Sequence, residues 1–387
     1  MSDSYFPVSL RKITLRNFRK YEKLTIDLNA PVVMITGKNG SGKTSILEAI
    51  SMVSSLRSFR RAADKELIAW DQNYYSLELE YKGTEGVEVL KMGYGKAEKN
   101  SPTVRTLVVN NVKVKKISGF LGRVQTVVFS PEDLKIIEGA PAERRKYIDM
   151  VLSLLSPGYL DTLQKYRKAL EMRGAVLKKR GDQSYIASIN RELAGFGSKI
   201  QSARVNFIQE FQKPFFEYIN KISGGEDEWN LAYVPSIEGG VEKDVYFDKL
   251  QASYSRDIRY KQTMYGIHRD RFIIHLPGST DREIRIVASQ GQKRTAALAM
   301  RMAQYRHTQE KTHETPVILI DDVLTELDTR RRNGFIRFMN DVGQALITLT
   351  DTSGIQDYIT AKDGSPNMIV YETDEVSGQT HLQKVQP

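Results

Sequence analysis

The stretch GKNGSGKT occupies residues 37–44 of this chain. It follows an apolar run at 32–35 and precedes a run with helical spacing at 45–56. Its residues match the pattern G-x-x-x-x-G-K-[ST] of phosphate-binding loops. A buried strand, a glycine-rich loop and a helix in this order therefore predict a site for the phosphates of a nucleotide.

Each residue type in this loop has a physical role in holding phosphate. Glycine lets backbone N–H groups turn inward onto phosphate oxygens, and the N-terminus of the following helix adds a partial positive charge. Lys43 can reach the β- and γ-phosphates and assist catalysis, and the Thr44 hydroxyl can ligate Mg²⁺. The residues expected to bind ATP are Gly37, Lys38, Asn39, Gly40, Ser41, Gly42, Lys43, Thr44 and Ser45.

The composition bounds the class of protein. With 387 residues, 40% of them hydrophobic, the chain is expected to form one large or two ordinary domains with a real core. It has no cysteine, which excludes disulfides and thiolate chemistry. The N-terminus has no apolar signal core and no window approaches 18 apolar residues, so we expect a soluble, cytoplasmic protein without a membrane segment.

The chain is basic, and the excess charge is concentrated. The net charge is +10 and the isoelectric point is about 9.4, which favours a polyanionic partner such as nucleic acid. Residues 165–204 hold ten Lys or Arg and three acidic residues, an excess of seven positive charges. The alternative is a soluble protein that is basic without such a partner.

Periodicity predicts an α/β chain interrupted by helices. Two strands joined by a polar turn are expected within 8–28, and further strands at 32–36, 77–94, 103–114, 124–129, 229–234, 272–276, 284–287, 317–320 and 344–350. Helices are expected at 45–56, 289–305 and 331–340, and a C-terminal hairpin turning at Ser377–Gly378.

Two long helical patterns, at about 158–180 and 185–218, lie between the α/β halves. The turn-like stretch RGDQS separates them, so we expect an antiparallel hairpin with arms of about 35 and 50 Å. Their aromatic and aliphatic stripes are most simply core. The predicted organisation is an N-terminal half at 1–145, a helical lobe at 146–264 and a C-terminal half at 265–387.

The stretch VILIDDVLTELD, residues 317–328, predicts the metal-binding side of the site. A buried strand that ends in a carboxylate is where a P-loop fold holds Mg²⁺. We therefore assign Asp321, with Thr44, to the metal and Asp322 to orienting or activating the attacking water. The alternative is that these carboxylates cap a helix.

A third stretch, ASQGQKR at 288–294, begins the helix that precedes Asp321. An N-cap serine would explain Ser289 adequately. In this position, however, the motif resembles the signature motif of ABC-type ATPases, which completes the nucleotide site of a second subunit. That resemblance assigns Ser289, Gln290, Gly291 and Gln292 to the site in trans, and Asp328 to the D-loop that crosses the same interface.

About 250 residues separate Gly37 from Ser289, far more than in a transporter ATPase. The chain instead resembles the structural-maintenance (SMC) and recombination branch, and within it the RecF family. The stretches that carry the resemblance are LRNFRKYEKLTIDL, ITGKNGSGKTSILEAI, SLRSFR, FSPEDLKIIEGAPAERRKYID, YGIHRDRF, ASQGQKR and LIDDVLTELD, in order along nearly the whole chain.

The chain departs from the pattern at two points and is ambiguous at a third. Gln290 stands where many relatives have Arg, and no histidine follows the strand at 344–350, so no switch histidine is proposed. Gln125 is a candidate Q-loop residue with a catalytic role, although a polar residue of a strand explains it equally well.

The resemblance implies a fold and a mechanism. The fold is an ABC/SMC-type P-loop ATPase head with mixed sheets and an inserted helical lobe. ATP with Mg²⁺ would drive two copies together, the dimer would clamp DNA at single-strand/double-strand junctions, and weak DNA-linked hydrolysis would open it. The implied partners are RecO and RecR, which help load RecA at gaps, and the N-terminal Arg19 is a candidate nucleotide contact.

Charge alone suggests where DNA would bind. The candidate contacts are Arg57, Arg60 and Arg61 after the first helix, Lys113, Lys115 and Lys116 in a strand-turn region, and Lys178, Lys179 and Arg180 at the hairpin tip. Each cluster could equally be a solvated face.

Two other functions compete with a DNA clamp. An ABC-type ATPase subunit that drives a membrane partner would purify with membranes and would not bind DNA. A P-loop kinase would turn over as a monomer with a small acceptor, and its Ser289–Gln292 stretch would be accidental.

Overall fold

The computed structural model describes residues 5–96, 103–179, 183–350, 368–376 and 379–385. The chain forms two compact units. Unit 1 comprises Met1–Asp133, Lys221–Gly225 and Leu298–Pro387, and unit 2 comprises Leu134–Asn220 and Glu226–Ala297. These units divide the chain at other points than the predicted domain boundaries near 145 and 265, and residues 289–292 fall in unit 2 with the helical lobe. The predicted division into two halves of an ATPase head and an inserted lobe stays a prediction.

Unit 1 contains a six-stranded sheet that is mostly parallel. Its strands pair in the order β16 (Gln379–Val385), β15 (Met368–Val376), β4 (Val32–Gly37), β14 (Ala345–Leu349), β13 (Val317–Asp321) and β9 (Thr126–Phe129). Only β16 runs antiparallel to its neighbour. The apolar runs predicted as buried strands at 32–36 and 317–320 are β4 and β13; the turn predicted at 377–378 lies outside the described residues.

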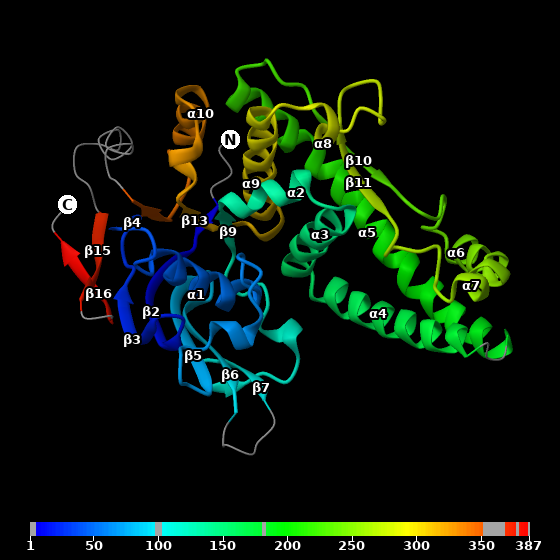
Figure 1. Cartoon of the computed structure of the whole chain (residues 1–387), viewed down its shortest axis with the longest axis horizontal. Coiled ribbons are helices and arrows are strands. Elements are labelled where there is room, and N and C mark those ends of the chain that lie inside the picture. Colours follow the sequence, from blue (N-terminus) through cyan, green and yellow to red (C-terminus); the bar gives the residue numbers. More distant parts are fainter. Residues whose placement is uncertain (1–4, 97–102, 180–182, 351–367, 377–378, 386–387) are drawn as a thin grey trace. The chain divides into compact units, whose positions relative to one another are not determined.

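A second, antiparallel sheet completes the core of unit 1. Its order is β3 (Tyr21–Asp27), β2 (Ser9–Phe18), β5 (Tyr74–Gly83), β6 (Gly86–Gly95), β7 (Val104–Val109) and β8 (Val112–Lys113). Helix α1 (Lys43–Ser55) contacts strands of both sheets, and its apolar residues share one buried cluster with them (Figure 1). This packing fixes the helix that follows the phosphate loop.

Smaller elements complete unit 1. They are β1 (Phe6–Pro7), which pairs with β12 (Glu314–Thr315), the helix α10 (Thr329–Met339), and the 3₁₀ turns at Asp64–Leu67, Ile117–Gly119, Pro131–Asp133 and Val323–Glu326. The helix predicted at 331–340 is therefore confirmed as α10.

Unit 2 is mainly helical. Its elements are α2 (Leu134–Glu138), α3 (Pro141–Leu155), α4 (Pro157–Lys178), α5 (Gln183–Ser223), β10 (Asn230–Val234), α6 (Lys243–Ala252), α7 (Tyr254–Tyr260), β11 (Arg271–His275), α8 (Ile284–Val287) and α9 (Gln290–Thr312). The last residues of α5 and most of α9 belong to unit 1. The two long helices confirm the predicted hairpin, and α6 and α7 lie beside the outer end of α4 (Figure 1).

The predicted apolar stripes of the hairpin are buried. Tyr159, Leu163 and Tyr166 of α4 pack in one cluster with Leu193 and Ile200 of α5. Proline at 214 lies within α5, which continues to Ser223. The interpretation of these stripes as core is confirmed.

One predicted element is wrong. Residues 284–287, IRIV, form the helical turn α8 and not a strand. Their alternation of apolar and polar residues suits an edge strand, but Ile286 is 67% exposed and only Glu283 makes an isolated bridge, to His275. A run of four residues carries too little periodicity to distinguish one helical turn from a strand.

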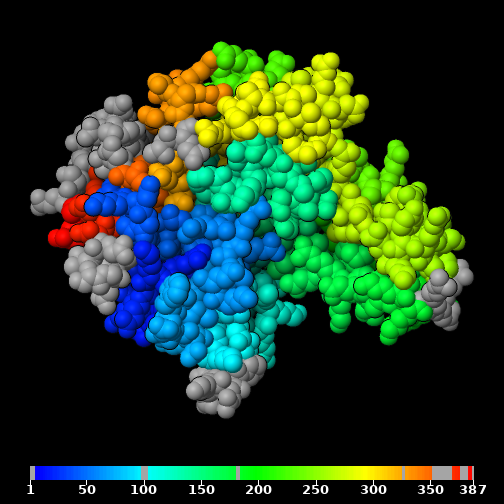
Figure 2. All heavy atoms as spheres, viewed as in Figure 1, coloured from blue at the N-terminus to red at the C-terminus, as the bar shows by residue number. Residues whose placement is uncertain are grey.

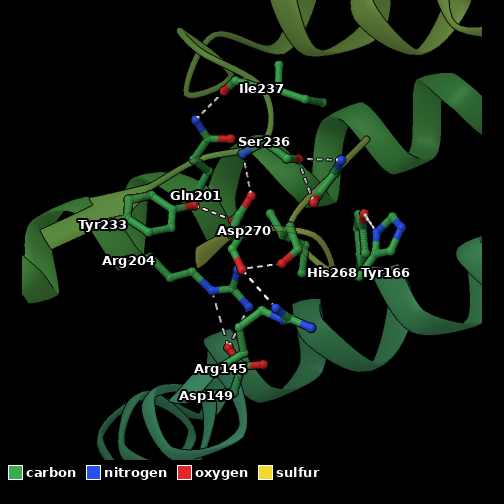
Figure 3. A network of polar contacts seen from close by, with 12 residues as sticks. Arg145, Asp149, Tyr166, Gln201, Arg204, Tyr233, Ser236, Ile237, His268 and Asp270 are labelled. Carbon is green, nitrogen blue, oxygen red and sulfur yellow. Dashed lines mark hydrogen bonds and ion pairs between the residues drawn. The ribbon is translucent and has the colours of Figure 1, made fainter. Parts of the chain in front are cut away.

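A buried ion-pair network crosses unit 2 (Figure 3). The guanidinium of Arg204, on α5, donates to Asp149 of α3 and to Asp270, both at 2.8 Å, and to the Ile267 carbonyl at 2.7 Å. Asp270 also accepts hydrogen bonds from the Tyr233 hydroxyl and the Ser236 amide. Arg204 is 1% exposed, so this charge is balanced by its own surroundings rather than by water.

Candidate nucleotide-binding site

The phosphate loop has a shape that only glycine permits at two positions. Gly37 has a φ of 139°, and a Cβ there would lie 2.2 Å from the Thr373 hydroxyl oxygen. Gly42 has a φ of 98°, and a Cβ there would lie 2.6 Å from the Tyr21 hydroxyl oxygen. The tip at 38–40 is exposed, so the loop has a tightly packed base and an open crest.

The side chain of Lys43 is folded back over this loop. Its ammonium donates to the carbonyl oxygens of Gly37, at 2.6 Å, and Lys38, at 2.8 Å. Burial lowers the pKa of Lys43, although the carboxylates of Asp322 and Asp321 act in the opposite direction. A positive charge is thus held at the loop with no direct carboxylate partner among these hydrogen bonds.

The predicted metal-binding residues meet. The Thr44 hydroxyl, at the start of α1, donates to Asp321 Oδ1 at 2.7 Å, and Thr348 of β14 donates to the same oxygen at 2.8 Å. Burial raises the pKa of Asp321, while these hydrogen bonds and the nearby Arg60 guanidinium lower it. A hydroxyl beside a buried carboxylate is a hard-oxygen donor set of the kind that Mg²⁺ prefers.

Strand order explains why these residues meet although 277 positions separate them. Strand β14 pairs with both β4 and β13, all three in parallel, so their carboxyl ends lie at one edge of the sheet. Asp322 follows Asp321 at this edge with a φ of 51°, a left-handed conformation that aspartate tolerates better than most residues. Its predicted role toward water remains a proposal.

Two residues that the sequence did not single out border this site. Strand β9 ends beside β13, with Phe129 paired to Ile320, so Ser130 lies level with Asp321. The Ser130 and Tyr21 hydroxyls are buried and have no hydrogen-bond partner in the described structure. An orphaned hydroxyl is costly in a folded chain, so one beside Gly42 and one level with Asp321 fit a site that binds a polar ligand. The position of Ser130 directly after a strand was the available signal.

Two other candidates are held by hydrogen bonds to neighbouring protein groups, and their predicted roles stay proposals. Arg19 donates two hydrogen bonds, both at 2.8 Å, to the fully buried carboxylate of Glu48 on α1. The Gln125 carbonyl accepts the amide of Val317, at the opposite end of β13 from Asp321, about 13 Å along the strand. Its side chain donates to the Gly122 carbonyl at 2.9 Å, and its predicted catalytic role stays a proposal.

The signature stretch forms a capping box at the start of α9. The Ser289 hydroxyl accepts the amide of Gln292 at 3.2 Å, and the Gln292 side chain accepts the amide of Ser289 at 2.9 Å. Gln290 donates to Glu138, and Gln292 to Asp227, both within unit 2. Ser289 and Gln290 are exposed and Gly291 is half-buried, so this end of the helix is open to solvent.

Asp328, the predicted D-loop residue, caps α10. Its carboxylate accepts the backbone amide of Arg331 at 2.9 Å, and this hydrogen bond lowers the pKa of Asp328. Asp328 is thus the N-cap residue of α10 in this structure. Its predicted role at a subunit interface stays a proposal.

The basic clusters differ in burial. Arg57, Arg60, Arg61, Lys113, Lys115, Lys116, Lys178 and Lys179 are exposed, and Arg180 lies outside the described residues. Two of the ten basic residues in 165–204, Arg173 and Arg204, are fully buried and paired with carboxylates, Arg173 with Asp257. The hairpin surface is therefore less basic than its sequence implies.

Two features are absent from the described ranges of the chain. No helix there has the length and apolarity needed to cross a bilayer. No group of three or more His, Asp or Glu side chains there could hold a metal alone. The second result is compatible with Mg²⁺, which is commonly held by one or two protein groups together with nucleotide phosphates.

The parallel sheet, the phosphate loop after β4 and the carboxylate at the end of β13 define a P-loop ATPase head with an inserted helical lobe. A family model described as RecF/RecN/SMC N terminal domain matches residues 9–357. The DNA replication and repair protein RecF of Leptospira interrogans serogroup Icterohaemorrhagiae serovar Lai (strain 56601) is 38% identical over 352 residues, which is 90% of this chain and 94% of that protein. The chain belongs to the RecF family.

Other matches agree. The DNA replication and repair protein RecF of Clostridium acetobutylicum is 35% identical over 356 residues, 90% of this chain and 95% of that one. A solved structure of the recombination mediator protein RecF-ATP in the RecFOR pathway has a TM-score of 0.86 at 29% identity and covers 100% of both chains. The SMC head bound to the C-winged helix domain of ScpA, at 15% identity and a TM-score of 0.54, supports the fold.

Proposed function

We propose that this chain is an ATP-gated DNA clamp of the RecF kind, which acts in DNA repair and replication. The observation that carries the proposal is the convergence of the phosphate loop with Asp321, where Thr44 and the carboxylate are 2.7 Å apart. The similarity to the solved RecF-ATP protein supports ATP as the nucleotide.

Each residue of the loop would have a defined task when ATP binds. The Lys43 ammonium would exchange its two carbonyl partners for phosphate oxygens, since charge-assisted bonds to phosphate are stronger than bonds to neutral carbonyls. Thr44 and Asp321 would hold Mg²⁺, which when bound neutralises phosphate charge. Asp322 would orient the attacking water, and hydrolysis would be slow.

A second copy of the chain would complete the site. The exposed signature stretch, Ser289–Gln292, would contact the γ-phosphate held by the other copy. Directly before it, Ile286 and Val287 are 67% and 49% exposed, and a second copy would cover these apolar side chains. The exposure of polar and apolar residues at one helix start supports an interface there.

The experiment for the gated dimer is sedimentation with and without ATP. The wild type should dimerise only with ATP, and Lys43→Ala should stay monomeric. Ser289→Arg should bind ATP as a monomer but fail to dimerise, while Ser289→Asn, which keeps the N-cap acceptor, controls for loss of the capping box. A dimer that is identical in all forms and conditions would contradict the proposal.

The experiment for DNA binding is a salt series with ATP, with ADP and without nucleotide. Tight, ATP-dependent binding that weakens steeply with salt is expected, because contacts to the phosphate backbone release counterions. ATP-independent binding would separate DNA binding from gating. Turnover of a small acceptor by a monomer would favour a kinase, and association with membranes without DNA binding would favour a membrane-driving ATPase.

The partners follow from the family. The solved relative is a recombination mediator protein in the RecFOR pathway. For this chain we propose RecO and RecR as partners at single-strand/double-strand junctions, with RecA loading as the outcome. Co-sedimentation of purified RecR with the ATP-bound chain on gapped DNA tests this part separately.

A further inference from the structure

Trp70 is the most exposed large apolar side chain among the described residues, at 91%. The only other tryptophan of the chain, Trp229, is 2% exposed. Tryptophan usually buries most of its surface in a core or an interface, since its ring contributes a large hydrophobic area. The 91% exposure of the Trp70 side chain therefore indicates that this indole contacts a binding partner.

The backbone that carries Trp70 is fixed in unit 1. The Ala69 amide donates to the Asn17 carbonyl at 2.8 Å, and the Gln72 amide donates to the Ala69 carbonyl at 3.2 Å, which closes a turn around Trp70. Asp71 takes the left-handed position of this turn, with a φ of 60°. The indole thus projects from a rigid base, and little backbone freedom is lost when it binds.

A preceding part of the same loop is anchored next to the phosphate-loop helix. The Arg19 amide donates to the Leu67 carbonyl at 2.8 Å, and its guanidinium donates to the Glu66 carbonyl at 3.2 Å. The same guanidinium is bound by Glu48 of α1. The segment 57–72 therefore runs from the neighbourhood of the nucleotide site to the exposed indole.

The surroundings of Trp70 are polar. The residues that follow it, Asp71, Gln72 and Asn73, are all exposed, and Ile68 is half-buried against the core. An aromatic hot spot for a protein partner typically sits within a packed patch ringed by other contacts. Stacking on a nucleic-acid base requires only one open π-face and cations near the backbone.

Cations are present on the same segment. Arg57, Arg60, Arg61 and Lys65 are exposed, and the light-blue part of the sequence to which they belong lies on the surface that faces the viewer in Figure 2. Of the three acidic residues between 57 and 72, Asp64 pairs with Arg105, and Glu66 accepts the Ala63 amide. Asp71 is the remaining carboxylate of the segment. Arg61 itself lies 3.9 Å from Glu132, and the exposed cations of the segment favour an anionic partner over a neutral or basic protein surface.

We propose that Trp70 is a base-stacking residue, on which an unpaired DNA base lies flat, with Lys65 placed to contact a neighbouring phosphate. The proposal rests on the DNA binding proposed above and extends it to the single-stranded side of a junction. It predicts that Trp70 matters for single-stranded and gapped DNA and little for blunt duplex, whose bases are already stacked.

Intrinsic fluorescence makes this contact directly measurable. In Trp229→Phe, Trp70 is the sole tryptophan, and its emission should be quenched when single-stranded (dT)₂₀ is added with ATP. In Trp70→Phe, only the buried Trp229 remains, and its emission should not respond. A blue shift without quenching would report burial against protein, for example a second copy, and would overturn the stacking proposal.

Affinity gives the second readout. Trp70→Ala should weaken binding of (dT)₂₀ by roughly 5- to 150-fold, the range of about 1–3 kcal/mol per stacked base. Trp70→Leu, which keeps apolar bulk without a π-face, should lose about as much, and blunt duplex affinity should be unchanged in both. Lys65→Gln should reduce the slope of log affinity against log salt by about 1.

The outcomes separate the two proposals. If the wild type binds DNA with ATP but Trp70→Ala binds (dT)₂₀ equally well, base stacking is refuted and the clamp stands. If the wild type binds no DNA under any nucleotide condition, the clamp and the stacking contact both fail.

Discussion

Two clusters of buried charge in this molecule are built in opposite ways. In unit 2, Arg204 lies between Asp149 and Asp270, so the cation and both anions come from the chain itself. In unit 1, Asp321 accepts hydrogen bonds from two neutral hydroxyls, and Lys43 donates to loop carbonyls. In the first cluster the charged groups pair with one another. In the second, the carboxylate and the ammonium each make their hydrogen bonds to neutral groups.

This contrast distinguishes a structural charge cluster from a binding site. The charged groups of the Arg204 network are paired with one another, which makes the network costly to break and gives its charges no need of a ligand. The Asp321 site carries a carboxylate whose pKa is raised by burial and has two orphaned hydroxyls at its border. Such a site is better satisfied when polar oxygens and a cation enter it.

The largest expected effect is on the stability of the Arg204 network. Arg204→Met should lower the free energy of unfolding by about 3–5 kcal/mol, because Asp270 would stay buried without this cation and Asp149 would keep only the Arg167 cation, at 3.7 Å. Urea unfolding measures this. Arg306→Met, which removes an exposed pair with Glu310, is the matched control and should cost no more than about 0.5 kcal/mol. Equal effects would mean that the network does not stabilise unit 2.

The next largest effect is expected on ATP affinity at the Asp321 site, with the fold retained. Lys43→Ala should weaken ATP binding by about 2–3 kcal/mol, roughly 30- to 150-fold, because charged hydrogen bonds to phosphate are lost. Stability without nucleotide should change little, since Lys43 is held only by two carbonyls. Calorimetric titration with ATP measures the affinity, and an unchanged value would remove Lys43 from the site.

The pH dependence of stability tests a buried histidine of unit 2. His268 contacts the Tyr166 hydroxyl through Nδ1 and the Thr263 carbonyl through Nε2, and burial lowers its pKa from 6.5 to about 4. As the pH falls, the unfolded chain therefore binds a proton at this histidine before the folded chain does. The contribution of neutral His268 to the free energy of unfolding is complete above pH 6.5 and is lost as the pH falls toward 4.

The measurement is urea unfolding of the wild type and His268→Gln at pH 7.5 and pH 5. The wild type should lose about 2 kcal/mol more than the variant between these two values, from about 1.4 kcal/mol per pH unit below 6.5. Parallel losses in the two proteins would mean that His268 titrates normally in the folded state.

The smallest effect compares one serine from each cluster. Ser236 in unit 2 donates to the Gly266 carbonyl and accepts the Gly266 amide, so Ser236→Ala should cost about 1–2 kcal/mol. Ser130 has an orphaned hydroxyl, so Ser130→Ala should be neutral or stabilising by up to about 1 kcal/mol without nucleotide. If ATP uses this hydroxyl, Ser130→Ala should also bind ATP more weakly. A stability loss for Ser130→Ala equal to that of Ser236→Ala would refute the distinction between the two clusters.

Local sequence was sufficient for much of this protein. The sequence predicted a P-loop head of the RecF family from Gly37 and Gly42, from the apolar runs at 32–36 and 317–320, and from the spacing of Ser289 and Asp321. The family is confirmed. The long hairpin was also predictable, since its apolar period extends over many turns. Elements of four residues were not, and 284–287 was assigned wrongly.

Only the tertiary structure decided what surrounds the chemistry. Local pattern fixes which residues end a strand, but strand order depends on pairing between distant segments, and it is β14 between β4 and β13 that brings Thr44 to Asp321. The same long-range packing sets Tyr21 against Gly42 and places Gln125 at the other end of β13 from Asp321. It also buries Arg173 and Arg204, which the charge count had included in the basic stretch 165–204. Burial is a property of the folded whole, so no count of residue types along the chain could have supplied it.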